Sequence, residues 1–367
     1  MYLFACYSLY SPECEFISGV CRDGGIHISC VTIAQNDELI REPVVVFSSQ
    51  TVVPLVLIVT EYPWVSVSGF GAHIKSTQKH LIIQKKTGAE YYPLETVSNL
   101  LIVGGHTINS TTIAQLVRNG TFISFFDPDG TPIGTIKPYC DTNQEGSNNG
   151  QQAIPRQRYA IAIAQASIKS RIFAIERIQE LQNTCLFYEG ELEFLRKAQD
   201  EMEYLIKLDE IRRLHKLTSD MYYEIMSRNM PSDLGYRRRT IRPQTDPINA
   251  MLSLGYAMLF GNCYVAIVGA RLNPDAGLMH EGKGSLVHDL IEPLKAGMVD
   301  PIVFHIARES LLASDFELTQ DRCMVSDEVI KAMMKLFYTA ITTEKINEQV
   351  YNFSTSLENY SDVKILY

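Results

Sequence analysis

Several common catalytic signatures are missing from this 367-residue sequence. Its eight cysteines form no CxxC pair, which argues against zinc-ribbon and thioredoxin motifs. It has neither a GxGxxG fingerprint between a strand and a helix nor a serine in a GxSxG context, so neither a dinucleotide site nor a hydrolase nucleophile is indicated. We expect reduced, mostly buried cysteines, and a metal knot among the four in the first 30 residues is the less favoured alternative.

We also expect neither a membrane anchor nor a secretory leader. An apolar stretch near residues 52–59 contains Pro54 and is followed by Glu61, whereas a spanning helix needs about 20 apolar residues. The first 16 residues have no basic segment and carry an acid at Glu13. With 46% hydrophobic and 20% charged residues, the composition is that of a globular protein, and the length suits two domains. We expect a cytoplasmic protein.

Charge is distributed unevenly along the chain, whose net charge is −9. Residues 1–150 hold 8 basic and 13 acidic side chains, residues 151–300 hold 19 of each, and residues 301–367 hold 6 and 10. The total disfavours a nucleic acid partner, because phosphate binding depends on clustered lysine and arginine. Such a cluster nevertheless occurs at Arg237, Arg238, Arg239 and Arg242. It could neutralise several phosphates, although a solvated arginine face fits the pattern equally well.

Strand patterns fill the first part of the sequence. Residues 1–60 are typical of hairpins, and residues 64–138 contain four strand-like segments, HLIIQKK, LLIVGG, FISFF and TPIGTIKPY. One helix is expected within residues 110–120, with Ser110 as its N-cap and Gly120 just past its end. A polar segment rich in Asn, Gln and Gly, residues 141–155, is expected to be a linker.

Helical periodicity dominates from residue 156 onward, where apolar residues recur every three or four positions. We expect helices through about residue 228 and then at about 247–260, 284–297, 302–313 and 326–342, the last beginning after Ser326. The tail from Tyr351 has no period and is expected to be loosely ordered. The predicted fold class is α+β multidomain: an N-terminal β extension (1–60), a β-rich domain (61–140), the linker (141–155) and an all-α domain (156–367).

The densest set of candidate ligands lies in residues 277–300, GLMHEGKGSLVHDLIEPLKAGMVD. Asp289 and Glu292 stand at positions i and i+3 of a predicted helix, so both carboxylates project from one face, and His280 precedes that helix on a glycine-rich loop. This donor set suits a hard divalent cation, Mg²⁺ or Mn²⁺, which could polarise a phosphoryl oxygen. An amphipathic helix with acids on its wet face is the more frequent outcome of such spacing.

Other histidines are weaker candidates. His215, in DEIRRLHKLTSD with Glu210 five positions before it, could contribute from a separate helix, although such a residue is more often on the surface. His288 points away from the face that Asp289 and Glu292 share, so we assign it to packing or to support of the site.

Two long motifs resemble those of the CRISPR-associated adaptation integrases. The run RRRTIRPQTDPINAMLSLGYAML, residues 237–259, is similar to the family's segment rich in Arg and Pro, with Gln244 at a position where proline is common. HEGKGSLVHDLIEPLKAGMVD follows at the right distance and resembles the family's metal-binding loop and helix. The strands before them also resemble the family's β-domain. The resemblance covers roughly residues 64–345 and none of residues 1–60.

The resemblance assigns roles residue by residue. His280 matches the histidine ligand, Glu292 the second acidic ligand and Asp289 the acid beside the site, which makes these three the predicted catalytic residues. Counted back from Tyr222, His215 takes the place of the third ligand, where the family usually has glutamate. The resemblance thus implies a divalent ion, Mg²⁺ or Mn²⁺, held by His215, His280 and Glu292. The exchange removes one negative charge and should weaken Mg²⁺ binding. Glu210 or Glu224 could compensate, though neither stands at the motif position.

The resemblance also implies a function and partners. It implies a homodimer joined through the β-rich domain, a catalytic helical domain, and assembly with the small second CRISPR adaptation protein. The implied reaction joins 3′-hydroxyl ends of short foreign DNA to the repeat array and cuts branched DNA. The DNA backbone would be held by a set of basic residues: Arg237, Arg238, Arg239, Arg242 and Lys283. Two alternatives stay open, a catalytically weakened DNA-binding subunit and a stand-alone mobile-element integrase of the same superfamily.

Overall fold

The structure of the protein is a computed structural model that describes residues 26–35, 38–47, 55–57, 61–138, 155–319 and 322–367. The chain divides into two compact units, Met1–Pro54 and Leu55–Tyr367. In the first unit, β1 (Ile26–Gln35) pairs antiparallel with β2 (Glu38–Phe47), as the hairpin prediction for this region expected. The predicted linker 141–155 falls almost wholly outside the described residues.

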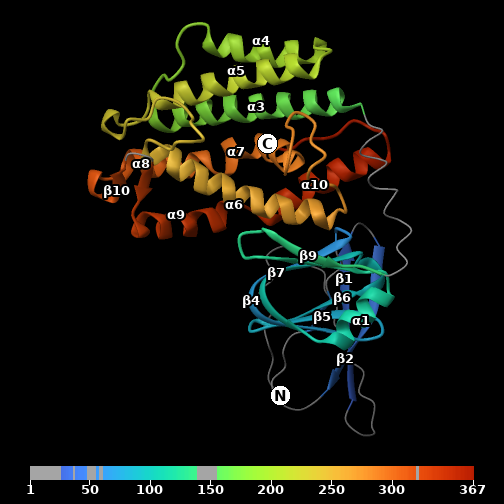
Figure 1. Ribbon diagram of the computed structural model, residues 1–367. Helices are drawn as coiled ribbons and strands as arrows, with labels where there is room; N and C mark the ends of the chain where they lie inside the picture. The colour runs from blue at the N-terminus through green and yellow to red at the C-terminus, as the bar shows by residue number, and fades with distance from the viewer. Residues whose placement is uncertain (1–25, 36–37, 48–54, 58–60, 139–154, 320–321) are drawn as a thin grey trace. The chain divides into compact units, whose positions relative to one another are not determined.

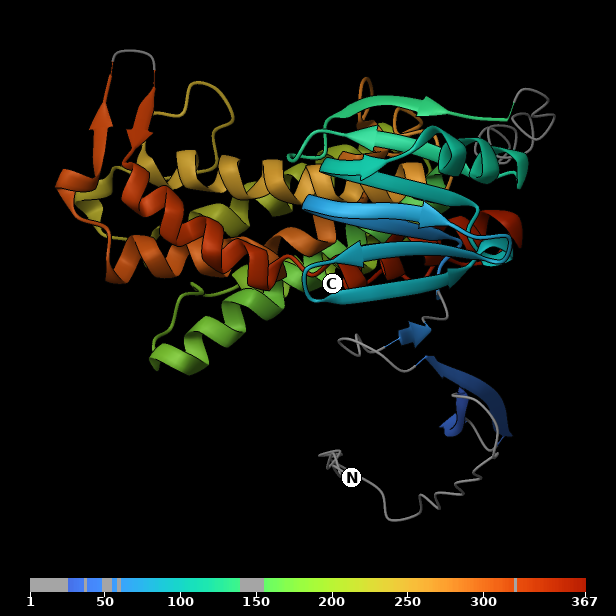
Figure 2. The same ribbon diagram turned by 90° about the horizontal axis from the view of Figure 1, so that it is seen from below.

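A seven-stranded mixed sheet begins the second unit (Figures 1 and 2). Its order is β3-β6-β5-β4-β7-β8-β9, in which β4, β7 and β8 are parallel neighbours and the β4–β5, β5–β6 and β8–β9 pairs are antiparallel. The strands are β3 (Leu55–Leu57), β4 (Trp64–Ser76), β5 (His80–Lys85), β6 (Gly88–Pro93), β7 (Asn99–Ile108), β8 (Phe122–Phe126) and β9 (Pro132–Ile136). All four predicted strand segments are therefore present, and β3 lies before the boundary predicted at residue 61.

Helix α1 (Ser110–Arg118) connects the parallel strands β7 and β8. Its predicted position is correct but its predicted N-cap is wrong, because the side chain of Asn109, not Ser110, accepts the hydrogen bond from the N–H of Thr112 at 2.7 Å. Asparagine and serine cap helices about equally well, so composition alone did not distinguish two adjacent candidates. Gly120 lies just past the helix end with φ +84°, where a left-handed conformation favours glycine.

Eight helices of the described residues build the remainder of the unit. They are α3 (Arg156–Gln182), α4 (Glu191–Glu201), α5 (Leu208–Ser227), α6 (Pro247–Gly269), α7 (Ser285–Met298), α8 (Asp300–Glu309), α9 (Asp327–Ala340) and α10 (Thr343–Glu358). Helix α3 packs against α5 and α7, and α7 packs in turn against α6 (Figure 1). A small hairpin of β10 (Phe316–Leu318) and β11 (Cys323–Val325) is separate from the large sheet (Figure 2). The predicted fold class, β-rich then helical, is confirmed.

Helix α6 is the main core helix. By length and composition it could cross a membrane, but 56% of its most apolar window is buried inside the protein, as in the core helix of a globular domain. The side chain of Asn99, on β7, donates to the carbonyls of Val268 and Gly269 at the C-terminal end of α6, both at 3.2 Å. Close approach also occurs at Gly261, where an added Cβ would lie 1.8 Å from the carbonyl oxygen of Asp129.

The C-terminal tail differs from its prediction. Residues from Tyr351 belong to α10 as far as Glu358, and Phe353 and Leu357 of this helix are buried in the core. Asn and Ser residues stand between these buried apolar side chains and interrupt the helical period, so the sequence pattern did not predict this helix. The helix predicted after Ser326 is confirmed, since Ser326 is the N-cap of α9. Cys263 and Cys323 are buried, Cys185 is exposed, and none of these three forms a disulfide.

Candidate active site

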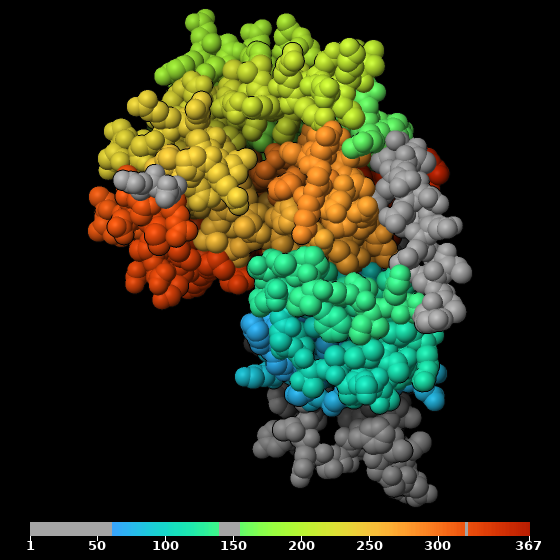
Figure 3. Space-filling model, viewed as in Figure 1, coloured from blue at the N-terminus to red at the C-terminus, as the bar shows by residue number. Residues whose placement is uncertain are grey.

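Helix α7 brings the two predicted carboxylates to the interior of the helical half. It begins at Ser285 after a turn in which Gly282 and Gly284 have positive φ angles of 94° and 68°. Asp289 and Glu292 are both buried, with 0% and 7% exposure, so the alternative of a wet acidic face is excluded. Figure 3 shows the orange part of the chain, around residues 270–290, at the surface of the viewed face. The helix therefore carries acids inward from a loop that faces solvent.

Asp289 holds the loop that precedes its own helix. Its carboxylate accepts hydrogen bonds from the N–H groups of Leu278, Met279 and His280 at 2.5, 3.2 and 3.0 Å. The same carboxylate lies 2.7 Å from Nδ1 of the His280 ring. Backbone dipoles thus compensate this buried charge, and the loop conformation depends on it.

The Asp289 contact also sets the chemistry of His280. A carboxylate accepts hydrogen bonds, so Nδ1 of His280 donates to Asp289, and in the neutral form of the ring Nε2 carries the lone pair. The His280 side chain is 40% exposed. A carboxylate–histidine pair of this kind is what a metal ligand or a proton acceptor needs for orientation.

Glu292 is compensated in a different way, by two side-chain cations. Its Oε2 accepts a hydrogen bond from Nη2 of Arg171, on α3, at 3.0 Å, and its Oε1 accepts one from Nζ of Lys295, one turn further along α7. The side chains of all three residues are 15% exposed or less. Both oxygens of Glu292 are therefore engaged by fixed positive charges.

His215 lies next to the same guanidinium. Its Nε2 is 3.3 Å from Nη1 of Arg171, 3.2 Å from Oγ of Ser167 and 3.9 Å from Oε2 of Glu292. The structure thus brings together His215 and Glu292, 77 positions apart in the sequence, from α5 and α7. Arg171 contacts both of the atoms that would have to share an ion.

Burial and charge set the protonation of this centre. Burial and the neighbouring Arg171 lower the pKa of His215 to about 3, so its imidazole is neutral near pH 7. Burial acts to raise the pKa of Glu292, but Lys295 and Arg171 outweigh it and the net shift is downward. The group is therefore a neutral imidazole, one carboxylate and two cations.

The predicted metal ligands do not fit a divalent ion in this arrangement. No group of three His, Cys, Asp or Glu side chains in the described part of the chain could hold a metal. Arg171 occupies the region shared by His215 and Glu292, while His280 makes its contacts with Asp289. Arg171 thus joins His215 to Glu292, and Asp289 orients His280.

Glu210 and Glu224, the two acids that could compensate for His215, make other contacts, whereas the ring of His288 lies 5.7 Å from that of His280. Glu210 accepts from the N–H of Lys207 at 3.4 Å, at the start of α5, and Glu224 lies 3.7 Å from Arg228. His288 is exposed and its ring packs beside an aromatic ring, consistent with the packing role assigned to it. These contacts place both acids away from His215 and Glu292.

A third buried carboxylate, Asp300, lies in a tyrosine network. Tyr222 and Tyr256 donate to its two oxygens at 2.9 and 2.5 Å, and the hydroxyl of Tyr223 is 2.7 Å from that of Tyr256. Burial raises the pKa of Asp300 to about 6, against the effect of the two tyrosine hydrogen bonds. The sequence reasoning used Tyr222 only to count positions and missed this network.

The arginine segment divides into exposed and anchored residues. The exposed members of the predicted DNA-binding set are Arg237, Arg238, Arg242 and Lys283. Arg239 instead donates to the side chains of Asn249 and Ser253, both at 2.9 Å, and lies over the ring of Tyr256. Arg239 therefore anchors the segment to α6.

Two important residues were absent from the sequence-based site, Arg171 and Lys295. Lys295 stands three positions after Glu292, a spacing that predicts an ion pair on a helix. Arg171 lies on the buried face of α3 between Ile168 and Ile172. A cation at an apolar position of an amphipathic helix signals a buried acidic partner, and that signal was available in the sequence.

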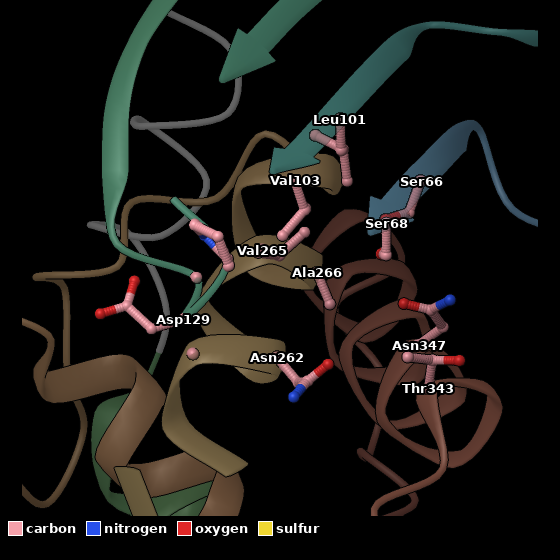
Figure 4. Close-up of a pocket in the computed structure, with 13 residues that line it drawn as sticks. Ser66, Ser68, Leu101, Val103, Asp129, Asn262, Val265, Ala266, Thr343 and Asn347 are labelled. Atoms are coloured by element: carbon pink, nitrogen blue, oxygen red, sulfur yellow. The ribbon is translucent and has the colours of Figure 1, made fainter. Parts of the chain in front are cut away.

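One pocket of the structure has a separate set of lining residues. It is lined by the β8–β9 turn, residues of β4 and β7, and side chains of α6 and α10, including Ser66, Ser68, Asn262 and Asn347 (Figure 4). None of the predicted site residues lines it.

Comparison with known proteins establishes the family. The family model for CRISPR associated protein Cas1 matches residues 65–339, and the chain belongs to this family, which confirms the resemblance. A relative from Methanospirillum hungatei, a putative CRISPR-associated endonuclease Cas1 2, is 39% identical over 301 residues, covering 82% of this chain and 99% of its own.

Solved structures show the same fold. The chain of a partial Cas6-RT-Cas1–Cas2 complex matches with a TM-score of 0.68 at 19% identity, covering 84% of this chain and 100% of that one. The crystal structure of a TtCas1–DNA complex matches with a TM-score of 0.53 at 19% identity, covering 79% and 96%. At this level of identity the likeness concerns the fold alone.

Proposed function

We propose that this Cas1 protein is a DNA endonuclease and integrase of CRISPR spacer acquisition, which joins 3′-hydroxyl ends of short foreign DNA to the repeat array and cuts branched DNA. The observation that carries the proposal is the His280–Asp289 pair at the start of the motif helix. It offers an oriented imidazole, on a partly exposed side chain, in the loop that also contains the exposed Lys283. Family membership and the endonuclease name of the 39% identical relative support the reaction class.

The side chains have separate roles in this proposal. His280 presents Nε2 to the scissile phosphate region, and Asp289 fixes its tautomer and the loop. Glu292, with Arg171 and Lys295, sets the charge of the helical interior. The resemblance implies Mg²⁺ or Mn²⁺ as cofactor, but the surroundings of Glu292 do not fit either ion, so no step is assigned to one.

DNA is the proposed macromolecular ligand. Phosphate contacts would come from Arg237, Arg238, Arg242 and Lys283, whose side chains are exposed. Arg239 would contribute by holding the segment in place. A homodimer and the small second adaptation protein are the proposed protein partners in the cytoplasm. A Cas1–Cas2 complex among the structural neighbours supports the latter.

The test is cleavage and strand transfer on branched DNA, with and without Mn²⁺. Wild type is compared with His280→Ala and Glu292→Ala, and with His305→Ala as a matched control, because His305 is an exposed histidine on α8. We expect turnover in wild type and the control, and its loss in the other two variants. Equal activity in all four proteins would contradict the proposal.

A second function is favoured by one specific observation, the two cations on Glu292. In this alternative the chain binds DNA and assembles with its partners, but the site around Glu292 does not support catalysis. Wild type would then bind branched DNA with salt-dependent affinity and leave it uncut at every Mn²⁺ concentration.

A further inference from the structure

The negative charge of Glu292 is already more than offset by two cations of the protein itself. One carboxylate faces a guanidinium and an ammonium, and the third neighbour, His215, accepts a hydrogen bond without adding a charge. Arg171 is 3% exposed, on a helix that packs against both α5 and α7. Its head group therefore has no short route to solvent and is held where the two ligand-bearing helices meet.

We infer that Arg171 is a built-in competitor that, with Lys295, keeps a divalent cation off Glu292. This inference rests on the proposed function only in taking Glu292 and His215 as the expected ion position. It identifies Arg171 as the residue that decides whether this centre binds a metal.

The geometry indicates that Arg171 and a divalent ion would compete for Glu292 and His215 and would not bind there together. The guanidinium uses one nitrogen on Glu292 and another on His215, so it spans the 3.9 Å between Nε2 and Oε2 that an ion would bridge. An ion added beside Arg171 would face two fixed positive charges in a region from which water is largely excluded, where repulsion is strong. Removing Arg171 would leave Glu292 with only Lys295 and leave Nε2 of His215 with only the Ser167 hydroxyl.

Histidine at position 215 fits this arrangement. A neutral imidazole nitrogen can accept from Arg171, and Ser167 lies within hydrogen-bond distance of the same atom. A glutamate at this position would place a second carboxylate beside Glu292, which favours a doubly charged ion over a single guanidinium. The histidine and the buried arginine are therefore complementary.

The test measures Mn²⁺ binding to the full chain without DNA, by isothermal titration and by the electron paramagnetic resonance signal of free Mn²⁺. The proteins are wild type, Arg171→Met, Glu292→Gln, and Arg171→Met combined with Glu292→Gln. Arg177→Met is the matched control, because Arg177 is an exposed arginine on the same helix. We expect Arg171→Met to bind one Mn²⁺ at least tenfold more tightly than wild type and the control, and the added Glu292→Gln change to abolish that gain.

Two results would overturn the inference. One is a wild-type Mn²⁺ site that Glu292→Gln alone removes, since Glu292 would then bind the ion with Arg171 present. The other is an Arg171→Met protein that binds Mn²⁺ no better than wild type. If Arg171→Met does not fold, Arg171→Gln, whose amide can still donate, replaces it, and the wild-type measurement stands by itself. Because DNA is absent, the outcome is independent of whether the protein cuts or joins strands.

Discussion

Two carboxylates one turn apart on α7 are stabilised in different ways. Asp289 is surrounded by backbone N–H groups of the preceding loop and by His280. Glu292 is surrounded by the cations of Arg171 and Lys295. The first arrangement is local, since all its partners lie within 11 positions, whereas Arg171 is 121 positions from Glu292.

The difference indicates that Asp289 positions neighbouring groups, whereas Glu292 compensates buried charges. Asp289 orders a loop and orients an imidazole, so its loss should act first on conformation near His280. Glu292 joins α3 to α7 through a buried ion pair, so its loss should act on the stability of the whole helical half. A broad loss of stability in an Asp289 variant, together with a purely local change in a Glu292 variant, would contradict this comparison.

The largest effect is expected for Glu292→Gln. The change leaves the Arg171 guanidinium buried without a counter-charge, which should lower the free energy of unfolding by about 3 kcal/mol. Urea denaturation measures it. The matched control is Glu176→Gln, which alters an exposed pair with Arg196 at 3.0 Å and should cost less than about 1 kcal/mol. Equal losses in the two variants would show that burial does not strengthen the Arg171 pair.

Asp289→Asn should have a smaller and more local effect. Asparagine keeps one oxygen and turns an NH₂ group toward backbone donors, which should cost about 1–3 kcal/mol. Hydrogen exchange should show faster exchange of the amides of Met279 and His280 in this variant and unchanged exchange there in Glu292→Gln. Faster exchange of these amides in both variants would mean that the two carboxylates form a single unit.

Asp300 adds a third case to the comparison, a buried carboxylate that accepts hydrogen bonds from neutral tyrosine hydroxyls. Because folding raises its pKa to about 6 from 3.8, its protonated form favours the folded state, and that contribution is lost as pH rises from about 4 to 6. Between pH 4.5 and 7, wild type should lose about 2 kcal/mol of stability relative to Asp300→Asn, which does not titrate. Urea midpoints at both pH values measure the difference. A constant difference would show that Asp300 ionises normally.

The sequence predicted what depends on local spacing. The strand segments, the helix after Ser326 and the shared face of Asp289 and Glu292 all follow from periods of two or 3.6 residues. The tail was missed because Asn and Ser interrupt the apolar period of α10, whereas tertiary packing of Phe353 and Leu357 determines the helix.

Which residues make up the site depends on contacts between distant helices, and the spacing of residues along the sequence does not predict such contacts. The resemblance located His215, His280 and Glu292 and treated them as one cluster. It did not include Arg171, which enters from α3 and engages two of the three. A buried cation is visible in a sequence as a residue type on an apolar face, but its partner is decided by how helices pack.

The smallest expected effect on stability distinguishes exposed from anchored arginines. Arg238→Ala removes an exposed side chain and should change the free energy of unfolding by less than about 0.5 kcal/mol. If Arg238 contacts a phosphate, the same change lowers the slope of log affinity against log salt by about 1. Arg239→Ala instead removes donors to Asn249 and Ser253 and should destabilise the segment by about 1 kcal/mol. Fluorescence anisotropy across a salt series, together with urea midpoints, separates the two. A reduced slope without destabilisation in Arg239→Ala would place its guanidinium on the DNA, because an anchoring residue acts on binding only through the loop that it holds.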